Sequence, residues 1–232
     1  MPTRTLYEGG EYLAKNPGWH VEESPWKAEQ VLRMLKRNRL SPATVCDVGC
    51  GAGEVLSQLQ KRLSAECTLC GYDVSPLAIE FAKTRANERL QFRVSDFSDV
   101  GAGGFELIIV LDVLEHLEDY FDFLRRIKTK SCHKIFHIPL DLSVQTVLRR
   151  DGLLKRREMY GHLHYFTKET ALRMLRDAGY EILDYFYTPR SNDLAGNRTQ
   201  RLLKLVRKSC FAVNEDLTVR TLGGYSLLVL TR

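Results

Sequence analysis

The feature of the sequence that most constrains its fold is a glycine-rich turn that follows a short β-prone run. The run spans Thr44–Val48, and the turn reads Gly49-Cys50-Gly51-Ala52-Gly53. Glycines let the main chain turn sharply and approach a ligand without a Cβ in the way, and the amides that open the next helix attract negative charge. Leucines then recur at helical spacing, at Leu56, Leu59 and Leu63. This order predicts a parallel α/β sheet with a ligand site at the carboxyl end of the strand.

Strand-prone and helix-prone segments alternate along the rest of the chain. The further expected strands are Cys67–Tyr72, Gln91–Val94, Phe105–Val110, Lys134–Ile138, Tyr180–Tyr187 and Gly224–Leu230. The expected helices are Pro25–Asn38 capped by Ser24, one that starts at Ser75-Pro76, one with Leu114, Leu117, Phe121 and Leu124 facing inward, and one that Thr167 caps and Gly179 ends. The alternation predicts a doubly wound α/β fold. Its sheet is mostly parallel and seven-stranded, with helices on both faces and an antiparallel C-terminal edge pair.

The length of 232 residues suits one domain that covers the whole chain, 1–232. We expect residues 1–40 to form an N-terminal arm and helix, and 41–140 to form the cofactor-binding half. Two basic, helix-prone segments, 141–166 and 190–216, interrupt the alternation and are interpreted as lid or substrate insertions. Their cations favour an anionic acceptor, a membrane-surface substrate or RNA, or they form an ordinary solvated lid helix. No RNA-binding motif accompanies them, so RNA is the least favoured partner.

Composition and cysteine usage indicate a soluble, cytoplasmic protein. The net charge of +5 is a mild basic excess, well below that of a dedicated nucleic-acid binder. No apolar run is long enough for a signal peptide or a membrane span. Cys67 and Cys70 have C-x-x-C spacing, but residues three apart in a strand point to opposite faces and cannot share a metal ion. We therefore expect no metal site and interpret the six cysteines as reduced core residues.

Two carboxylates beside the glycine turn narrow the choice of ligand. Glu54 stands where the third glycine of a dinucleotide-binding turn would be, and its charge there disfavours a pyrophosphate. Asp47 comes just before the turn, at the end of the strand, and suits a ligand that carries positive charge, such as an amino group beside a sulfonium.

Four segments in order resemble the motifs of class I S-adenosylmethionine-dependent methyltransferases, which have a Rossmann-like fold. They are Asp47–Gly53, Gly71–Ser75, Val94–Phe97 and Leu111–Leu117. The resemblance implies S-adenosyl-L-methionine as cofactor and S-adenosyl-L-homocysteine as product. It implies that Asp73 holds the ribose hydroxyls, that Asp96 contacts the adenine amino group with Phe97 packed near the ring, and that the segment after the fourth strand lines the methionine end. The full predicted cofactor set is Asp47, Gly49, Cys50, Gly51, Gly53, Asp73, Val74, Asp96, Phe97, Leu111 and Asp112.

Each of these carboxylates has a structural alternative when it is taken alone. Asp47 can cap the turn, Asp73 can cap the helix after Ser75, and Asp96 can be a solvated loop residue. Four motifs in the right order at strand ends favour the cofactor interpretation.

The methyl acceptor leaves a weaker trace in the sequence. A base is needed only when the acceptor must lose a proton. His116, just after the fourth strand, is the candidate base, or else it has a structural role. His162, His164 and Tyr165 are candidate acceptor residues, or else packing residues. The chain lacks the Asn/Asp-Pro-Pro-Tyr/Phe signature, which disfavours adenine and glutamine methylation. The aromatic N-terminal residues Tyr7, Tyr12, Trp19, His20 and Trp26 either close over the cofactor or pack on the sheet edge.

The sequence therefore predicts a methyltransferase that acts on an oxygen or nitrogen of a small-molecule, lipid-linked or glycan-type acceptor. One alternative is an RNA methyltransferase that uses the basic insertions. Another is a cofactor-binding regulatory protein without transfer activity. The oligomeric state is not predicted.

Overall fold

The computed structural model describes residues 21–97, 104–189 and 198–232. Tyr7, Tyr12, Trp19 and His20, which were expected either to close over a cofactor or to pack on the sheet edge, lie outside the described residues, as do the first residues of the second insertion. Within the described ranges, no helix has the length and apolar character needed to cross a membrane.

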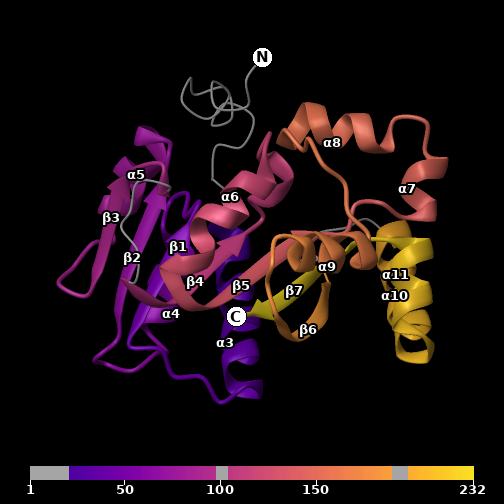
Figure 1. Cartoon of the computed structure of the whole chain (residues 1–232). Coiled ribbons are helices and arrows are strands. Elements are labelled where there is room, and N and C mark those ends of the chain that lie inside the picture. The colour runs from indigo at the N-terminus through magenta and orange to yellow at the C-terminus, as the bar shows by residue number, and fades with distance from the viewer. Residues whose placement is uncertain (1–20, 98–103, 190–197) are drawn as a thin grey trace.

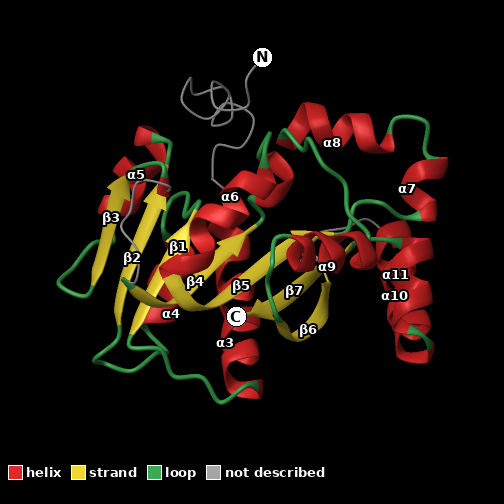
Figure 2. Ribbon diagram, in the orientation of Figure 1, coloured by secondary structure: helices red, strands yellow, loops and turns green. Residues whose placement is uncertain are grey.

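Seven strands form one mixed sheet in the order β3-β2-β1-β4-β5-β7-β6 (Figures 1 and 2). Their bounds are β1 Thr44–Val48, β2 Thr68–Asp73, β3 Leu90–Val94, β4 Phe105–Leu111, β5 Ser131–Pro139, β6 Ile182–Pro189 and β7 Tyr225–Thr231. The first five pair in parallel, whereas β7 pairs antiparallel with both β5 and β6. The strand order reverses between β1 and β4, and ligands of open α/β sheets bind at such a switch point.

Helices cover both faces of the sheet, as expected. Their bounds are α3 Ser24–Arg37, α4 Glu54–Gln60, α5 Pro76–Lys83, α6 Tyr120–Ile127, α7 Val144–Leu148, α8 Gly152–Tyr160, α9 Lys168–Asp177, α10 Arg198–Val213 and α11 Glu215–Leu222. One apolar core contains Met34 of α3, Leu56 of α4 and Ile79 of α5. A second core, on the other face, contains Leu124 of α6 and Leu175 of α9.

Several start and stop signals act as the sequence predicts. The Ser75 hydroxyl accepts a hydrogen bond from the amide of Ala78 at the start of α5. Thr167 caps α9 through a reciprocal capping box with Thr170. Gly179, with φ of 84°, follows the end of α9.

Three local predictions are wrong. Ser24 does not cap the first helix, because the chain already turns as a short 3₁₀ helix over Val21–Glu23 and runs straight into α3. The helix expected across Leu114 and Leu124 is split into a 3₁₀ turn over Leu114–His116 and α6, which Asp119 caps. Cys132 and Cys210 are exposed rather than buried in the core.

The glycine turn provides a test of the fold. Gly53 has φ of 77°, and a Cβ there would lie 2.5 Å from the Phe92 ring. We expect Gly53→Ala to lower the free energy of unfolding by about 2–4 kcal/mol, from backbone strain and overpacking together, as measured by urea denaturation. Gly104→Ala is the matched control, because a Cβ there meets no atom within 4 Å. Equal stability of the two variants would contradict this account of the turn.

Candidate functional site

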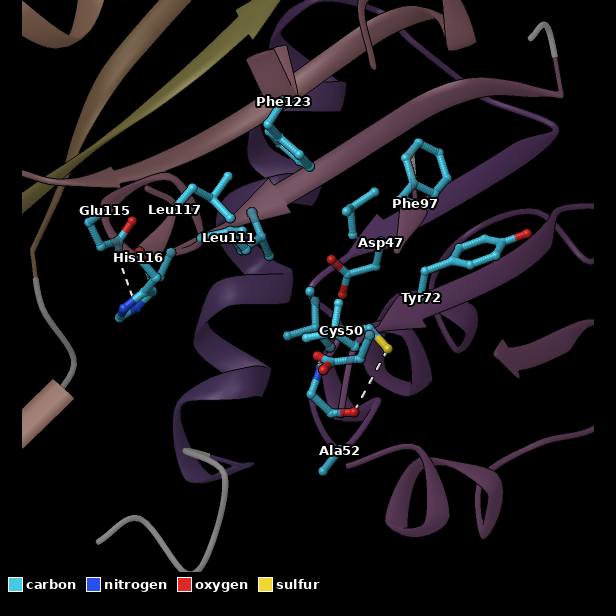
Figure 3. Close-up of a pocket in the computed structure, with 18 of the residues that line it drawn as sticks. Asp47, Cys50, Ala52, Tyr72, Phe97, Leu111, Glu115, His116, Leu117 and Phe123 are labelled. Carbon is cyan, nitrogen blue, oxygen red and sulfur yellow. Dashed lines mark hydrogen bonds and ion pairs between the residues drawn. The ribbon is translucent and has the colours of Figure 1, made fainter. Parts of the chain in front are cut away.

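A cavity of about 460 Å³ opens at the carboxyl ends of β1, β2 and β4 (Figure 3). Its walls come from the glycine turn, from the N-terminal part of α3, from the segment between β4 and α6, and from the residues just after α8. All eleven predicted cofactor residues line it: Asp47, Gly49, Cys50, Gly51, Gly53, Asp73, Val74, Asp96, Phe97, Leu111 and Asp112. Segments separated by more than sixty residues therefore meet at the predicted switch point.

The glycine turn is held against the end of β2 by hydrogen bonds. Gly49, Gly51 and Gly53 all have positive φ, which favours residues without a Cβ. The amides of Gly49 and Cys50 donate to the Tyr72 carbonyl at 2.8 and 3.1 Å. The amide of Gly51 donates to Oδ2 of Asp73 at 2.8 Å. The turn is thus a fixed surface that leaves room for a ligand beside its main chain.

Asp73 has both a structural contact and a place in the cavity wall. Its second oxygen, Oδ1, accepts a hydrogen bond from the amide of Ser75 at 2.9 Å. The helix cap itself is Ser75, so the capping alternative for Asp73 holds only in part. Carboxylate oxygens each accept more than one hydrogen bond, and Asp73 can therefore bind a diol while it holds the turn.

Asp47 is a buried carboxyl group that faces the cavity from the end of β1 (Figure 3). It is 2% exposed, and no other described residue forms a hydrogen bond with its Oδ1. Burial, with a smaller effect of the Asp73 charge, raises its pKa to about 7. A cationic ligand beside such a buried carboxyl group would stabilise its charged form.

Asp112, which is half-buried, is the centre of a charge network. Its φ of 57° places it in the left-handed region. Oδ2 lies 2.7 Å from Nζ of Lys27, and Oδ1 lies 2.6 Å from Nδ1 of His137. The other imidazole nitrogen of His137 lies 2.8 Å from the Thr188 hydroxyl. Although burial favours the neutral acid, His137 and Lys27 hold the pKa of Asp112 well below its usual range.

Lys27 is a site residue that the sequence did not predict. It projects from α3 into the cavity wall and is the partner of Asp112. A single lysine on an amphipathic helix gives no sequence signal of such a role, because its partner lies 85 positions away.

Two of the predicted residues have surroundings that the sequence did not suggest. Glu54 is ion-paired with Arg85 at 2.6 Å and hydrogen-bonded to Gln58, and these partners hold its pKa down against the effect of burial. The pairing weakens the electrostatic argument against a pyrophosphate.

Phe97 is buried edge-on against Tyr72, with ring centroids 5.1 Å apart, whereas Asp96 is exposed at the cavity rim.

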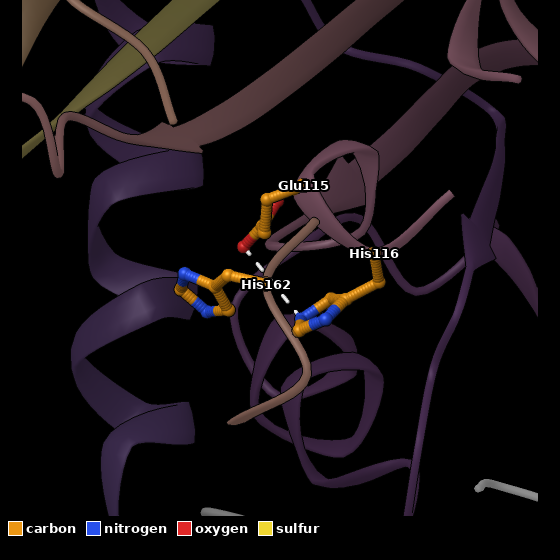
Figure 4. Close-up of side chains that lie close together, drawn as sticks. All are labelled: Glu115, His116 and His162. Carbon is orange, nitrogen blue, oxygen red and sulfur yellow. Dashed lines mark ion pairs between the residues drawn. The ribbon is translucent and has the colours of Figure 1, made fainter. Parts of the chain in front are cut away.

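Three polar side chains meet at the other end of the cavity. Glu115, His116 and His162 bring one donor atom each within 4.8 Å of one another (Figure 4). Glu115 is 1% exposed, and no other described residue donates a hydrogen bond to its carboxyl oxygens. Burial and the Asp112 charge raise its pKa well above the usual range. Burial and the neighbouring His162 lower the pKa of His116 to about 3.

One carboxylate and two imidazoles at this spacing can hold a metal ion or a polar group of a substrate. No metal site was expected from the sequence, and Glu115 was named there only as part of the Leu111–Leu117 motif. His116 and His162 were separate candidates, 46 positions apart. Only the fold brings them together.

His162 is oriented by a buried ion pair. Its Nδ1 lies 2.6 Å from Oδ2 of Asp141, and Oδ1 of Asp141 lies 2.9 Å from Nη1 of Arg156 on α8. A carboxylate only accepts hydrogen bonds, so Nδ1 of His162 carries the proton. In this tautomer Nε2 is a hydrogen-bond acceptor. Asp141 and Arg156 were not singled out in the sequence.

His164 and Tyr165 do not join this group. Neither lines the cavity. The Nε2 atom of His164 lies 2.8 Å from the Leu117 carbonyl, and the Tyr165 hydroxyl donates to the Leu153 carbonyl at 3.0 Å. Both side chains fasten the segment after α8 to its surroundings, and we leave them out of the acceptor site.

Residues 20–185 match the sequence profile of a family described as a methyltransferase domain. The chain belongs to this family. Among solved structures, it resembles the magnesium protoporphyrin IX methyltransferase of Synechocystis PCC 6803, with a TM-score of 0.59 and 20% identity over 89% of this chain and 81% of that one. It also resembles the N-methyltransferase NodS of Bradyrhizobium japonicum, with a TM-score of 0.55 and 19% identity over 89% and 85%. At such identities the likeness concerns the fold, which is the predicted Rossmann-like methyltransferase fold.

Curated relatives match over a shorter stretch. The chain is 38% identical over 96 residues to the mitochondrial ubiquinone biosynthesis O-methyltransferase of Schizosaccharomyces pombe. The aligned stretch covers 38% of this chain and 34% of the relative. It is 29% identical over 119 residues to the ubiquinone biosynthesis O-methyltransferase of Xanthomonas campestris. That alignment covers 46% of this chain and 48% of the relative. The chain thus spans between a third and a half of the length of these relatives.

The buried carboxyl of Asp47 gives a pH-dependent prediction. A carboxyl whose pKa is raised by folding stabilises the protein at low pH, and this contribution is lost as pH rises from the unfolded value of about 4 to the folded value of about 7. We therefore compare the free energy of unfolding of ligand-free Asp47→Asn with that of the wild type by thermal denaturation. We expect the difference to favour the variant by about 1–3 kcal/mol more at pH 8 than at pH 5. Asp96→Asn, at the exposed rim, is the control. A pH-independent effect of Asp47→Asn would contradict the assignment.

Proposed function

We propose that this protein is an S-adenosylmethionine-dependent O-methyltransferase of a small-molecule acceptor. The observation that carries the proposal is the arrangement of the cavity. A glycine turn with Asp73 and an unpartnered Asp47 oxygen lies at one end, and Glu115, His116 and His162 meet at the other. Family membership and the O-methyltransferases among the relatives agree with it.

The residues present fit S-adenosylmethionine. Asp73 would hold the ribose hydroxyls, the glycine turn would pack beside the nucleoside, and the exposed carboxylate of Asp96 would accept from the adenine amino group. Asp47 would compensate the positive charge of the methionine end, which explains why a buried carboxyl with an unpartnered oxygen is kept there. When bound, this cofactor supplies an electrophilic methyl group on a sulfonium.

The acceptor end is suited to a group that must lose a proton. Nε2 of His162 can take a proton from a hydroxyl, while Asp141 fixes the tautomer and stabilises the imidazolium. His116, the base considered in the sequence analysis, is neutral at pH 7 but weakly basic, because its pKa is about 3. We therefore assign the base role to His162 and a positioning role to His116.

Cofactor binding can be tested through Asp73. We expect Asp73→Asn to weaken S-adenosylhomocysteine binding about 10- to 100-fold, because a charge-assisted pair of hydrogen bonds is lost. Isothermal titration calorimetry measures the change. Glu106→Gln, near the N-terminal end of β4 and away from the cavity, is a control that should bind S-adenosylhomocysteine as the wild type does. Stronger stabilisation of the wild type by NAD than by S-adenosylhomocysteine would refute the cofactor assignment.

The acceptor and the base can be tested together by transfer of labelled methyl groups into a fractionated metabolite extract and into simple phenols and catechols. With an identified acceptor, we expect His162→Gln to lower kcat about 10²- to 10³-fold with little change in KM. Asp141→Asn should lower kcat less and shift the pH profile.

Other outcomes of this assay would overturn parts of the proposal. Loss of wild-type activity on chelation would mean that the three side chains work as a metal site rather than around a base. Labelling of RNA would favour the RNA methyltransferase alternative. Cofactor binding without transfer to any acceptor pool would favour a regulatory protein.

A further inference from the structure

The segment from α7 to α8 exposes an unusual number of large apolar side chains. Among the described residues, thirteen large hydrophobic side chains are exposed, and five of them lie between positions 144 and 159: Val144, Val147, Leu148, Leu154 and Met159. The side chain of Leu148 is 80% exposed. Contiguous exposed apolar groups on a protein surface mark interaction sites.

The apolar face of α7 lines an open pocket beside the Glu169–Arg220 ion pair, and the opposite face of the helix is fastened to the protein. Val144, Val147 and Leu148 are spaced i, i+3 and i+4 and so share one side of the helix. On the other side, Gln145 accepts a hydrogen bond from Arg207 of α10 at 3.0 Å. Ser143 caps α7 and packs against the glycine that ends α11. Figure 1 shows α7 and α8 at the periphery, away from the central strands, with α7 beside α10 and α11.

Exposed cations outnumber exposed carboxylates on the α7–α8 segment. Arg149, Arg150, Lys155 and Arg157 are exposed on the same segment, against two exposed carboxylates, Asp151 and Glu158. The remaining cation, Arg156, is turned inward to Asp141. Aliphatic side chains that insert into the acyl boundary, beside arginines and lysines at headgroup level, are the composition of a surface that binds anionic bilayers.

We propose that the α7–α8 segment seats the protein on a lipid bilayer that contains anionic phospholipids. The charge pattern disfavours the other occupants. A second copy docked face to face would bring the same arginines against each other. Single-stranded RNA is bound by aromatic side chains that stack on bases, and no exposed aromatic residue lies within 144–159.

This surface leads directly to the cavity. Tyr160, the last residue of α8, and His162 both line it, and Arg156 of α8 holds the Asp141 that orients His162. A helix of nine residues spans about 13 Å. A bilayer held at α7 would therefore lie within reach of the acceptor end of the cavity. Bilayer binding itself does not depend on which group is methylated.

The test is sedimentation of the full chain with vesicles of phosphatidylcholine, with and without phosphatidylglycerol. We expect binding to the anionic vesicles that falls as salt is added. The double variant Val147→Gln, Leu148→Gln should bind at least about tenfold more weakly, because two aliphatic side chains no longer insert. Arg149→Gln with Arg150→Gln should reduce the preference for anionic vesicles.

The matched control is Phe81→Gln, which changes an exposed apolar residue on α5, at the other end of the sheet. It should bind vesicles as the wild type does. Thermal stabilisation by S-adenosylhomocysteine shows that each variant is folded. The proposal fails if the wild type does not bind anionic vesicles, or if the α7 variants and Phe81→Gln weaken binding equally. It also fails if the α7 variants instead abolish a dimer seen by analytical ultracentrifugation, or RNA binding, while vesicle binding is unchanged.

Discussion

The hydrogen bond from the Gly51 amide to Asp73 is the contact on which the site depends. It joins the turn after β1 to the end of β2, and so holds the positive-φ glycines in a shape that leaves space for a ligand beside the main chain. Gly71 allows this close approach, because a Cβ there would lie 2.7 Å from the Cys50 sulfur. The position of Asp73 and the shape of the turn therefore depend on each other, and a change in either alters this end of the cavity.

The cavity wall holds more carboxyl groups than its cations can pair with. Asp47 and Glu115 are buried and Asp112 is half-buried, and Lys27 lies 2.7 Å from the Asp112 carboxylate, whereas Arg126 of the same wall is paired with Asp122. Asp112 receives Lys27 and His137, so its pKa falls, whereas the pKa values of Asp47 and Glu115 rise. The protein thus divides its carboxyl groups into one that is always charged and two that gain most from a cationic or proton-donating ligand.

The parts of the structure that were predictable are those in which neighbours in sequence are also neighbours in space. The glycine turn, the Ser75 and Thr167 caps and the buried β4 depend on local patterns, and a parallel sheet then brings the strand ends Asp47, Asp73 and Asp112 to one edge. Lys27, Asp141 and Arg156 were not predictable, because their roles come from partners far along the chain. The Ser24 cap failed because the preceding residues are already helical, which a cap signal alone does not reveal.

The Asp141 ion pairs connect the two proposals. Asp141 is buried between Arg156 of α8 and His162, so α8 and the proposed base share one carboxylate. If α8 moves when α7 meets a bilayer, Arg156 moves with it, and the hydrogen bond that fixes the His162 tautomer is the first contact to be affected. A buried carboxylate that loses one partner binds the other more strongly or takes up a proton. Vesicle binding should therefore change the pH profile of methyl transfer in the wild type but not in Arg156→Gln, because that variant has already lost the link between α8 and Asp141.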